Sequence, residues 1–98
     1  MGSKTAVEVR DNTEERRFEA YVEGSLAGFS TYELNDKGIS IMHTEVDDAF
    51  EGQGVGSELV RQMLDQIRQT ADLKVTVLCP FVTTWLRKHP DYQDLIRR

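Results

Sequence analysis

The stretch from Phe50 to Leu59 is the part of the sequence best suited to hold a ligand. Its three glycines, Gly52, Gly54 and Gly56, alternate along the chain, and a helical pattern follows at once. Glycine adopts positive φ angles and lets a ligand approach the bare backbone. A helix start offers unpaired N–H groups and the positive end of the helix dipole. The pattern therefore predicts a phosphate-binding pocket at this turn.

A second candidate for chemistry is Cys79, the single cysteine of the chain. It lies where a predicted strand ends and Pro80 opens a predicted helix, and a helix N-terminus favours the thiolate form of a cysteine. A single cysteine is also commonly a small buried hydrophobic residue. The residues alone leave both interpretations open.

Composition limits the class of protein. A chain of 98 residues suits one small domain with one core, so we expect a single domain over residues 1–98, with residues 1–5 disordered. No apolar run approaches the roughly 20 residues of a membrane span. The start of the chain lacks a signal-peptide core, which favours a cytoplasmic location. We therefore expect no membrane partner.

The net charge and the few cysteines and histidines argue against a nucleic-acid-binding protein and against a metal site. A net charge of −5 argues against a nucleic-acid partner, because such a partner needs clustered Lys and Arg. One cysteine cannot build a disulfide framework or a multi-cysteine zinc site. The two histidines, His43 and His89, lie far apart in sequence, so we predict no metal site.

The first half of the chain predicts an antiparallel meander. We expect strands over residues 6–10, 16–23, 26–34 and 39–46, separated by turns at 11–14, 24–25 and 35–38. In the last of these strands the side chains of Thr44 and Val46 should point to one face, and those of His43 and Glu45 to the other.

The second half predicts a βαβ unit followed by a C-terminal helix. A helix should run from about residue 55 to 70, a strand over 73–78 and a second helix from 80 to about 88. The two strands that flank the first helix should be parallel or splayed neighbours. On the second helix, Phe81, Trp85 and Leu86 should form the buried face. Residues 91–98 should add a helical turn, and the fold class is α+β with a mixed sheet.

Three segments resemble the GCN5-related N-acetyltransferases, the GNAT superfamily. Residues 51–56 correspond to the acetyl-CoA loop Gln/Arg-x-x-Gly-x-Gly/Ala. Residues 43–46 and 79–82 match the His-Thr-x-Val and Cys-Pro-Phe/Tyr-Val of a minimal single-domain subfamily. The match spans nearly the whole chain in the right order. One departure is Glu51, where the family has Gln or Arg, since a carboxylate is unfavourable near a pyrophosphate.

The resemblance implies a small GNAT-like fold and an acyltransferase that uses acetyl-CoA. It implies that residues 44–46 hold the pantetheine arm, that the N–H near Val46 polarises the thioester carbonyl, and that residues 52–57 hold the pyrophosphate. We expect Thr83, Thr84 and Lys88, which share the second predicted helix, to reach the phosphates or the adenine of coenzyme A. The expected cofactor-binding residues are Thr44, Glu45, Val46, Gly52, Gln53, Gly54, Val55, Gly56, Ser57, Thr83 and Lys88.

The same resemblance makes Cys79 the catalytic thiol. Its thiolate would accept the acetyl group, or the thiol would protonate the departing CoA thiolate. The sequence leaves both roles open. His43 would activate Cys79 or act as the general base for the incoming amine. The acidic residues Asp47, Asp48 and Glu51 would attract a cationic acceptor.

The expected activity is therefore N-acetyl transfer to an amine of a small molecule or of a protein lysine. A non-catalytic module that binds or senses acyl-CoA is an alternative. A small α+β interaction domain, in which the glycines only turn the chain, is another. We expect a monomer or a weak homodimer, because the first strand would be an exposed edge.

Overall fold

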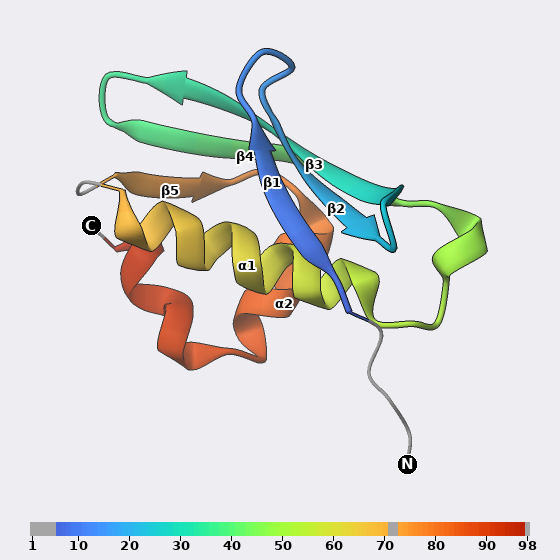
Figure 1. Cartoon of the computed structure of the whole chain (residues 1–98). Coiled ribbons are helices and arrows are strands. Elements are labelled where there is room, and N and C mark those ends of the chain that lie inside the picture. Colours follow the sequence, from blue (N-terminus) through green and yellow to red (C-terminus); the bar gives the residue numbers. More distant parts are fainter. Residues whose placement is uncertain (1–5, 71–72, 98) are drawn as a thin grey trace.

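A computed structural model describes residues 6–70 and 73–97, which form a five-stranded sheet with the helices on one face (Figure 1). The elements are β1 (Glu8–Asn12), β2 (Arg17–Val22), β3 (Ser25–Asn35), β4 (Gly38–Val46), the 3₁₀ helix η1 (Asp48–Phe50), α1 (Val55–Gln69), β5 (Lys74–Val77), α2 (Pro80–Arg87) and the 3₁₀ helix η2 (Pro90–Ile96). Residues 1–5, for which disorder was expected, lie outside the described residues.

The sheet has the strand order β1-β2-β3-β4-β5. Strands β1 to β4 are an antiparallel meander, and β5 runs parallel to β4. The crossover between β4 and β5 carries α1 across one face of the sheet (Figure 1). The predicted α+β class, a meander followed by a βαβ unit and a C-terminal helix, is confirmed.

The core lies between the sheet and α1. On β2, Phe18, Ala20 and Val22 are buried, as the alternating pattern predicted. Burial of each large apolar side chain contributes about 1.5–3 kcal/mol, so this stripe holds α1 firmly on the sheet. The buried stripe of α1 is Val55, Leu59, Val60, Met63, Leu64 and Ile67.

Three predicted details are wrong. The first strand continues to Asn12, so the turn after it falls on residues 13–16 rather than 11–14. The turn between β2 and β3 falls on Glu23 and Gly24, which have φ angles of 49° and 81°, rather than on residues 24–25. A two-residue hairpin turn with positive φ at both positions matches the twist of the strands, so Ser25 already belongs to β3. On α2, Phe81 is 45% exposed. Val82 takes its place beside Trp85 and Leu86, which gives the usual spacing of a helix stripe.

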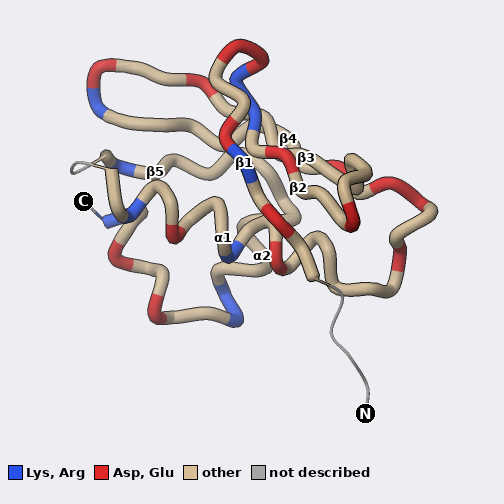
Figure 2. The backbone as a smooth tube through the Cα atoms, viewed as in Figure 1, with Lys and Arg blue, Asp and Glu red and all other residues tan. Residues whose placement is uncertain are grey.

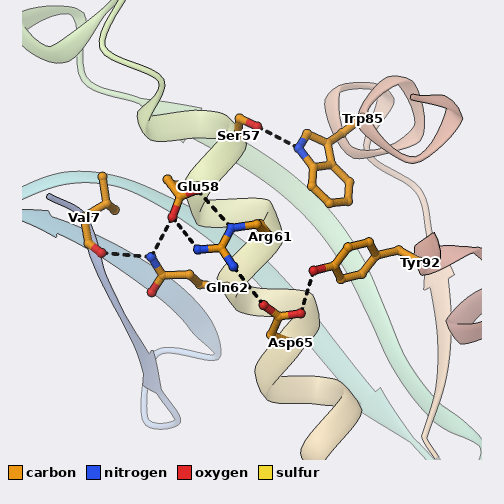
Figure 3. A network of polar contacts seen from close by, with 8 residues as sticks. All are labelled: Val7, Ser57, Glu58, Arg61, Gln62, Asp65, Trp85 and Tyr92. Atoms are coloured by element: carbon orange, nitrogen blue, oxygen red, sulfur yellow. Dashed lines mark hydrogen bonds and ion pairs between the residues drawn. The ribbon is translucent and has the colours of Figure 1, made fainter. Parts of the chain in front are cut away.

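Polar contacts fix α1 on both sides (Figure 3). The amide of Gln62 donates to the carbonyl of Val7 at 2.9 Å, which ties the helix to the chain entering β1. On the opposite side, Tyr92 donates to Asp65 at 2.7 Å and the Trp85 indole donates to Ser57 at 2.9 Å. The start of α1 is therefore held in a set position relative to both the sheet and α2.

The sheet face that carries no helix has a buried carboxylate near its centre. Glu19 is 5% exposed and accepts hydrogen bonds from Arg17 at 2.6 Å, Tyr21 at 2.7 Å and Asn12 at 3.1 Å. Burial acts to raise the pKa of Glu19, but the hydrogen bonds from these three side chains outweigh it and lower the pKa. The ionised form of Glu19 therefore stabilises the fold.

We expect Glu19→Gln to lower the free energy of unfolding at neutral pH by about 1–3 kcal/mol, the range for hydrogen bonds to a charged group. Because the folded-state pKa lies below the unfolded value, this stabilisation is fully present above the unfolded pKa and is lost as the pH falls through the folded pKa. The free energies of unfolding of wild type and variant, measured with urea, should therefore converge at acid pH. Glu33→Gln, at an exposed position on β3, should show no such dependence, and a pH-independent difference for Glu19→Gln would contradict this account.

Candidate active site

Strands β4 and β5 separate part-way along their length. Their parallel pairing runs from Gly38 opposite Lys74 to Ile41 opposite Val77, and the last bond between them joins Leu78 N–H to the Ile41 carbonyl at 2.9 Å. Strand β4 then continues to Val46, whereas β5 ends. Within the described chain, residues 42–46 have no strand beside them on this edge. The predicted splay is confirmed.

A bulge in β4 sets the direction of the side chains beyond the splay. Tyr32 pairs with Ile41 and Thr31 pairs with His43, so Met42 is an extra residue with no partner on β3. The extra residue shifts the alternation, so that Thr44, opposite buried Ser30, faces the helices as Ile41 does. His43 faces the opposite side of the sheet.

The backbone of β4 offers hydrogen-bonding groups to the opening. Asp47 N–H donates to the Ala27 carbonyl of β3 at 2.7 Å. In an antiparallel ladder such bonds recur at every second residue, so the backbone groups of Glu45 point to β3. The N–H and C=O groups of Thr44 and Val46 point the other way, into the space left by β5. An extended ligand with amide groups can pair with them there.

The glycine-rich loop forms an open pocket at the start of α1. Gly52 and Gly54 have φ angles of 79° and 77°, which side-chain-bearing residues rarely adopt. Gly54 is the N-cap of α1, and no side chain caps the helix. A Cβ atom at either glycine would meet nothing within 4 Å, so the space above the loop is clear. These features suit a phosphate group.

This pocket has a volume of about 270 Å³ and collects most of the residues expected to bind the cofactor. Phe81 closes one side of it, because a Cβ atom on Gly56 would come within 2.7 Å of the Phe81 ring. Its lining comprises Val46, Phe50, Glu51, Gly52, Gly54, Val55, Gly56, Ser57 and Phe81. The structure thus brings the end of β4, the loop and the start of α2 together.

A larger groove of about 460 Å³ adjoins this pocket and shares Ser57 and Phe81 with it. It runs along α2, where the rings of Trp85 and His89 stack with centroids 3.7 Å apart, and Lys88 also lines it. Ser57 accepts its hydrogen bond from Trp85, so its own O–H proton is left to donate.

Thr83 lies away from this groove. It lines a separate hollow beside β5, and its hydroxyl donates to the Cys79 carbonyl at 3.1 Å. The structure therefore brings Lys88 to the groove that begins at the glycine loop, but it does not bring Thr83 there.

Cys79 lies directly beneath the splay, as the N-cap of α2. Its Sγ donates to Thr44 Oγ1 at 3.4 Å, and Thr44 Oγ1 lies 2.9 Å from Ser30 Oγ. Three side chains from β3, β4 and the start of α2 thus form a polar row. Cys79 is only 3% exposed, so its thiol contacts Thr44 rather than solvent.

The structure does not bring His43 and Cys79 together. His43 lies on the face of β4 that carries no helix, where its Nε2 is 2.8 Å from Glu45 Oε2. Both side chains are well exposed. The partner of the Cys79 thiol is Thr44, which sequence reasoning assigned only a backbone role. The bulge at Met42, which no residue type marks, decides this arrangement.

Acidic residues gather on the loop between β4 and α1, which carries red segments in Figure 2. Asp47 accepts a hydrogen bond from Ala49 N–H at 2.8 Å and so caps η1, a short helix that sequence reasoning missed. An Asp directly before a turn is a usual N-cap signal and could have revealed it. Asp48 and Glu51 are exposed on the same loop.

The model of the protein family described as GCN5-related N-acetyl-transferase matches residues 17–95 of the chain. The chain belongs to this family. The match covers every element that forms the opening, the loop and the groove. The splayed strands and the glycine-rich helix start are thus parts of a GCN5-related N-acetyltransferase fold, and acetyl transfer is the activity that this fold supports.

Relatives of this member of the family include Protein NATD1 of Xenopus tropicalis, which is 27% identical over 99 residues, covering 99% of this chain and 90% of the relative. Protein NATD1 of Mus musculus is 32% identical over 59 residues, covering 60% of this chain and 53% of the relative. The similarity therefore extends along the whole chain in the first relative and along about half of the second.

Two solved structures share the fold. Ard1 from Thermoplasma volcanium matches with a TM-score of 0.55 and 29% identity over 66% of this chain and 45% of its own. Ribosomal-protein-alanine N-acetyltransferase from Brucella melitensis biovar Abortus 2308 matches with a TM-score of 0.55 and 21% identity over 81% of this chain and 56% of its own. The chain spans about half the length of each.

Among the described residues, no helix has both the length and the apolar character needed to cross a bilayer.

Proposed function

We propose that the protein, as the single domain expected from its length, moves an acetyl group from acetyl-CoA to an amine. One observation carries the proposal: the uncapped glycine-rich start of α1 lies beside the unpaired backbone of Thr44 and Val46. A phosphate site next to an open strand edge matches the two chemically distinct parts of coenzyme A. Membership of the acetyltransferase family supports the same conclusion.

The residues of the opening hold the cofactor in two ways. Backbone N–H groups at the start of α1 bind the diphosphate, helped by the helix dipole, and the Ser57 hydroxyl donates to it. The backbone of Thr44 and Val46 pairs with the pantetheine amides as a neighbouring strand would. Acetyl-CoA supplies the activated acetyl group, and the Val46 N–H donates to the thioester oxygen, where negative charge develops.

The groove along α2 takes the nucleotide end of coenzyme A in this proposal. The exposed face of Phe81 and the ring of Trp85 line it, and aromatic faces suit a flat base. Lys88 stands in the same groove and contributes a positive charge. Glu51, the departure from the family loop, lines the phosphate pocket, so the backbone donors have to outweigh its charge.

Cys79 is the proposed catalytic thiol. Its Sγ donates to Thr44 Oγ1 at 3.4 Å. A thiol held as a hydrogen-bond donor is arranged for the role of proton donor to the departing CoA thiolate, and this is the role that we favour over acetyl acceptor. Because Thr44 lies on β4 and Cys79 follows β5, their contact joins the two strands where they separate.

His43 and Glu45 are proposed to deprotonate the amine that accepts the acetyl group. Their contact of 2.8 Å on the open face forms a carboxylate–imidazole pair that can take a proton from an incoming ammonium. The acidic loop of Asp47, Asp48 and Glu51 attracts a cationic amine to the same end of β4. A small amine or a protein lysine satisfies this chemistry.

Thermal unfolding with acetyl-CoA, CoA or ATP tests this function. Saturating acetyl-CoA at about 100 times its Kd should stabilise the fold by about 2.7 kcal/mol, which raises the Tm by roughly 10 °C or more for a domain of this size. ATP should give a smaller shift, since it lacks the pantetheine arm.

Release of CoA thiol in the presence of a polyamine or a lysine peptide then separates catalysis from binding. Turnover supports the acetyltransferase. A Tm shift without turnover points to the acyl-CoA-binding module, and no shift with any CoA compound overturns both in favour of an interaction domain.

A further inference from the structure

A hollow of about 150 Å³ lies between β3 and the end of β4, outside the cofactor pocket and groove described above. Its lining comprises Leu26, Ala27, Gly28, Phe29, Glu45, Val46 and Asp47. Val46 also lines the phosphate pocket at the start of α1, so the two hollows meet at the last residue of β4. A molecule in this hollow therefore lies next to the strand end that is proposed to hold the thioester.

The side chains of the hollow belong to the sheet face that carries no helix (Figure 1). Phe29 pairs directly with Glu45 across the two strands, so both side chains point to the same face. Leu26 pairs with Tyr21, whose hydroxyl contacts the buried carboxylate of that face. The hollow thus opens on the face where His43 contacts Glu45, the pair proposed to deprotonate the amine.

Two carboxylates and no cation stand among the residues that line this hollow. Asp47 has extended backbone angles, φ −62° and ψ 134°, so its side chain continues the alternation of β4 and shares a face with Glu45. Residues two apart on an extended chain lie about 7 Å from each other. One oxygen of Asp47 accepts the Ala49 N–H and one oxygen of Glu45 contacts His43, so each carboxylate has a second oxygen that can accept from a ligand.

The rest of the hollow suits a methylene chain. Leu26 is 40% exposed, and the Phe29 ring lies directly opposite Glu45. The Arg17 guanidinium is 4.7 Å from the centre of the Phe29 ring but contacts Glu19 at 2.6 Å, so its charge is already balanced. Four methylene groups hold the two nitrogens of an extended diamine about 6 Å apart, which is close to the spacing of the two carboxylates.

We propose that the amine acceptor is an α,ω-diamine, a linear chain of about four methylene groups with an ammonium at each end. One ammonium lies at Glu45, the other lies at Asp47, and the methylene groups lie over Leu26 and Phe29. A lysine side chain presents a single ammonium and so engages only one of the two carboxylates. The inference rests on the proposed function, because it names the amine of that same reaction.

The transfer follows from this placement. The pair of His43 and Glu45 takes one proton from the nearer ammonium, whose nitrogen lone pair then bonds to the acetyl carbon as the C–S bond breaks. Cys79 gives its proton to the departing CoA thiolate and is reprotonated by the second proton that the nitrogen gives up. The products are CoA, the singly acetylated diamine and one released proton.

Release of CoA thiol with 1,4-diaminobutane and with 1-aminopentane as acceptors tests the inference. The two amines have the same length and differ only in a terminal ammonium that takes the place of a methyl group. We expect kcat/KM to be about fivefold or more higher for the diamine, as for one additional ion pair near the surface. This ratio should fall as salt is added.

Asp47→Asn should bring the ratio of the two kcat/KM values close to one. Asn caps a helix as well as Asp does, so the variant keeps the cap of η1 and loses only the charge. Asp48→Asn is the matched control, because it removes the same charge from the next residue, which is exposed and does not line the hollow. It should keep the wild-type ratio. An unaltered Tm shift with acetyl-CoA shows that both variants keep their fold.

Three outcomes overturn the inference. Equal kcat/KM for the two amines in the wild type, or an equal fall of the ratio in both variants, overturns it and leaves the acetyltransferase standing. A lysine peptide with a higher kcat/KM than the diamine also overturns it, since the hollow then belongs to a protein side chain. Absence of CoA release with every amine overturns the proposed function and this inference together.

Discussion

Gly54→Asp should weaken acetyl-CoA binding by about a hundredfold or more, while Gly24→Asp should leave it unchanged. At Gly54 the new carboxylate stands at the N-cap of α1, where an Asp side chain accepts bonds from the first helical N–H groups. It therefore occupies the donors that the diphosphate needs and repels the diphosphate itself. Loss of two hydrogen bonds to a charged group corresponds to about 3 kcal/mol or more.

Gly24→Asp is a suitable control for Gly54→Asp, because the two glycines have similar backbone conformations. Its φ angle of 81° is close to the 77° of Gly54, and a Cβ atom at either position meets nothing within 4 Å. Both substitutions thus carry the same backbone cost of about 1 kcal/mol and the same added charge. Calorimetric titration with acetyl-CoA should show a loss of affinity in Gly54→Asp alone. Thermal unfolding without acetyl-CoA should show no greater loss of stability in Gly54→Asp than in Gly24→Asp, because an Asp at the N-cap stabilises the helix. Unchanged affinity in Gly54→Asp would remove the loop from the binding site.

The parts of the site that obey local rules could be predicted from the sequence. The alternating glycines before an apolar helical stripe located the loop and α1, because positive φ and the helix period are properties of short segments. The direction of Thr44 and Val46 relative to His43 and Glu45 was also predictable from the period of a strand. These inferences need no knowledge of what the segments pack against.

The contacts between segments could not be predicted. The bulge at Met42 has no sequence signature, yet it decides that Thr44 faces the same side as Ile41. Phe81 belongs to a helix pattern that fits burial, but the missing side chain of Gly56 leaves room for its ring at the edge of the opening. The depth of Cys79 and its contact with Thr44 depend on how α2 packs under the splay, which is a tertiary property.

Replacing Cys79 by Ala should lower kcat by about a hundredfold to ten-thousandfold, the usual range for the loss of a general acid or base. Acetyl-CoA affinity should stay close to that of the wild type, because Cys79 does not line the phosphate pocket. Cys79→Ser is the second variant needed to separate catalysis from packing. Serine keeps the size and the hydrogen bond to Thr44, but its hydroxyl is a far poorer proton donor to a thiolate.

The Ser and Ala variants therefore separate chemistry from packing. If the thiol acts in catalysis, both variants are slow; if Cys79 only fills space beside Thr44, the Ser variant is as active as the wild type and the Ala variant loses stability alone. Thr44→Val adds a further control, because it leaves Cys79 in place but removes the acceptor of its proton and leaves buried Ser30 without its partner. That variant should lose about 1–3 kcal/mol of stability.

Intact mass after incubation with acetyl-CoA distinguishes the two catalytic roles of the thiol. An acetyl adduct that is absent from Cys79→Ser and is discharged by an amine identifies Cys79 as the acetyl acceptor. Slow variants without an adduct in the wild type identify it as the proton donor, the role favoured by its contact with Thr44. Full activity in Cys79→Ala with no adduct would leave direct attack by the amine, with His43 and Glu45 as its base, as the route that this geometry supports.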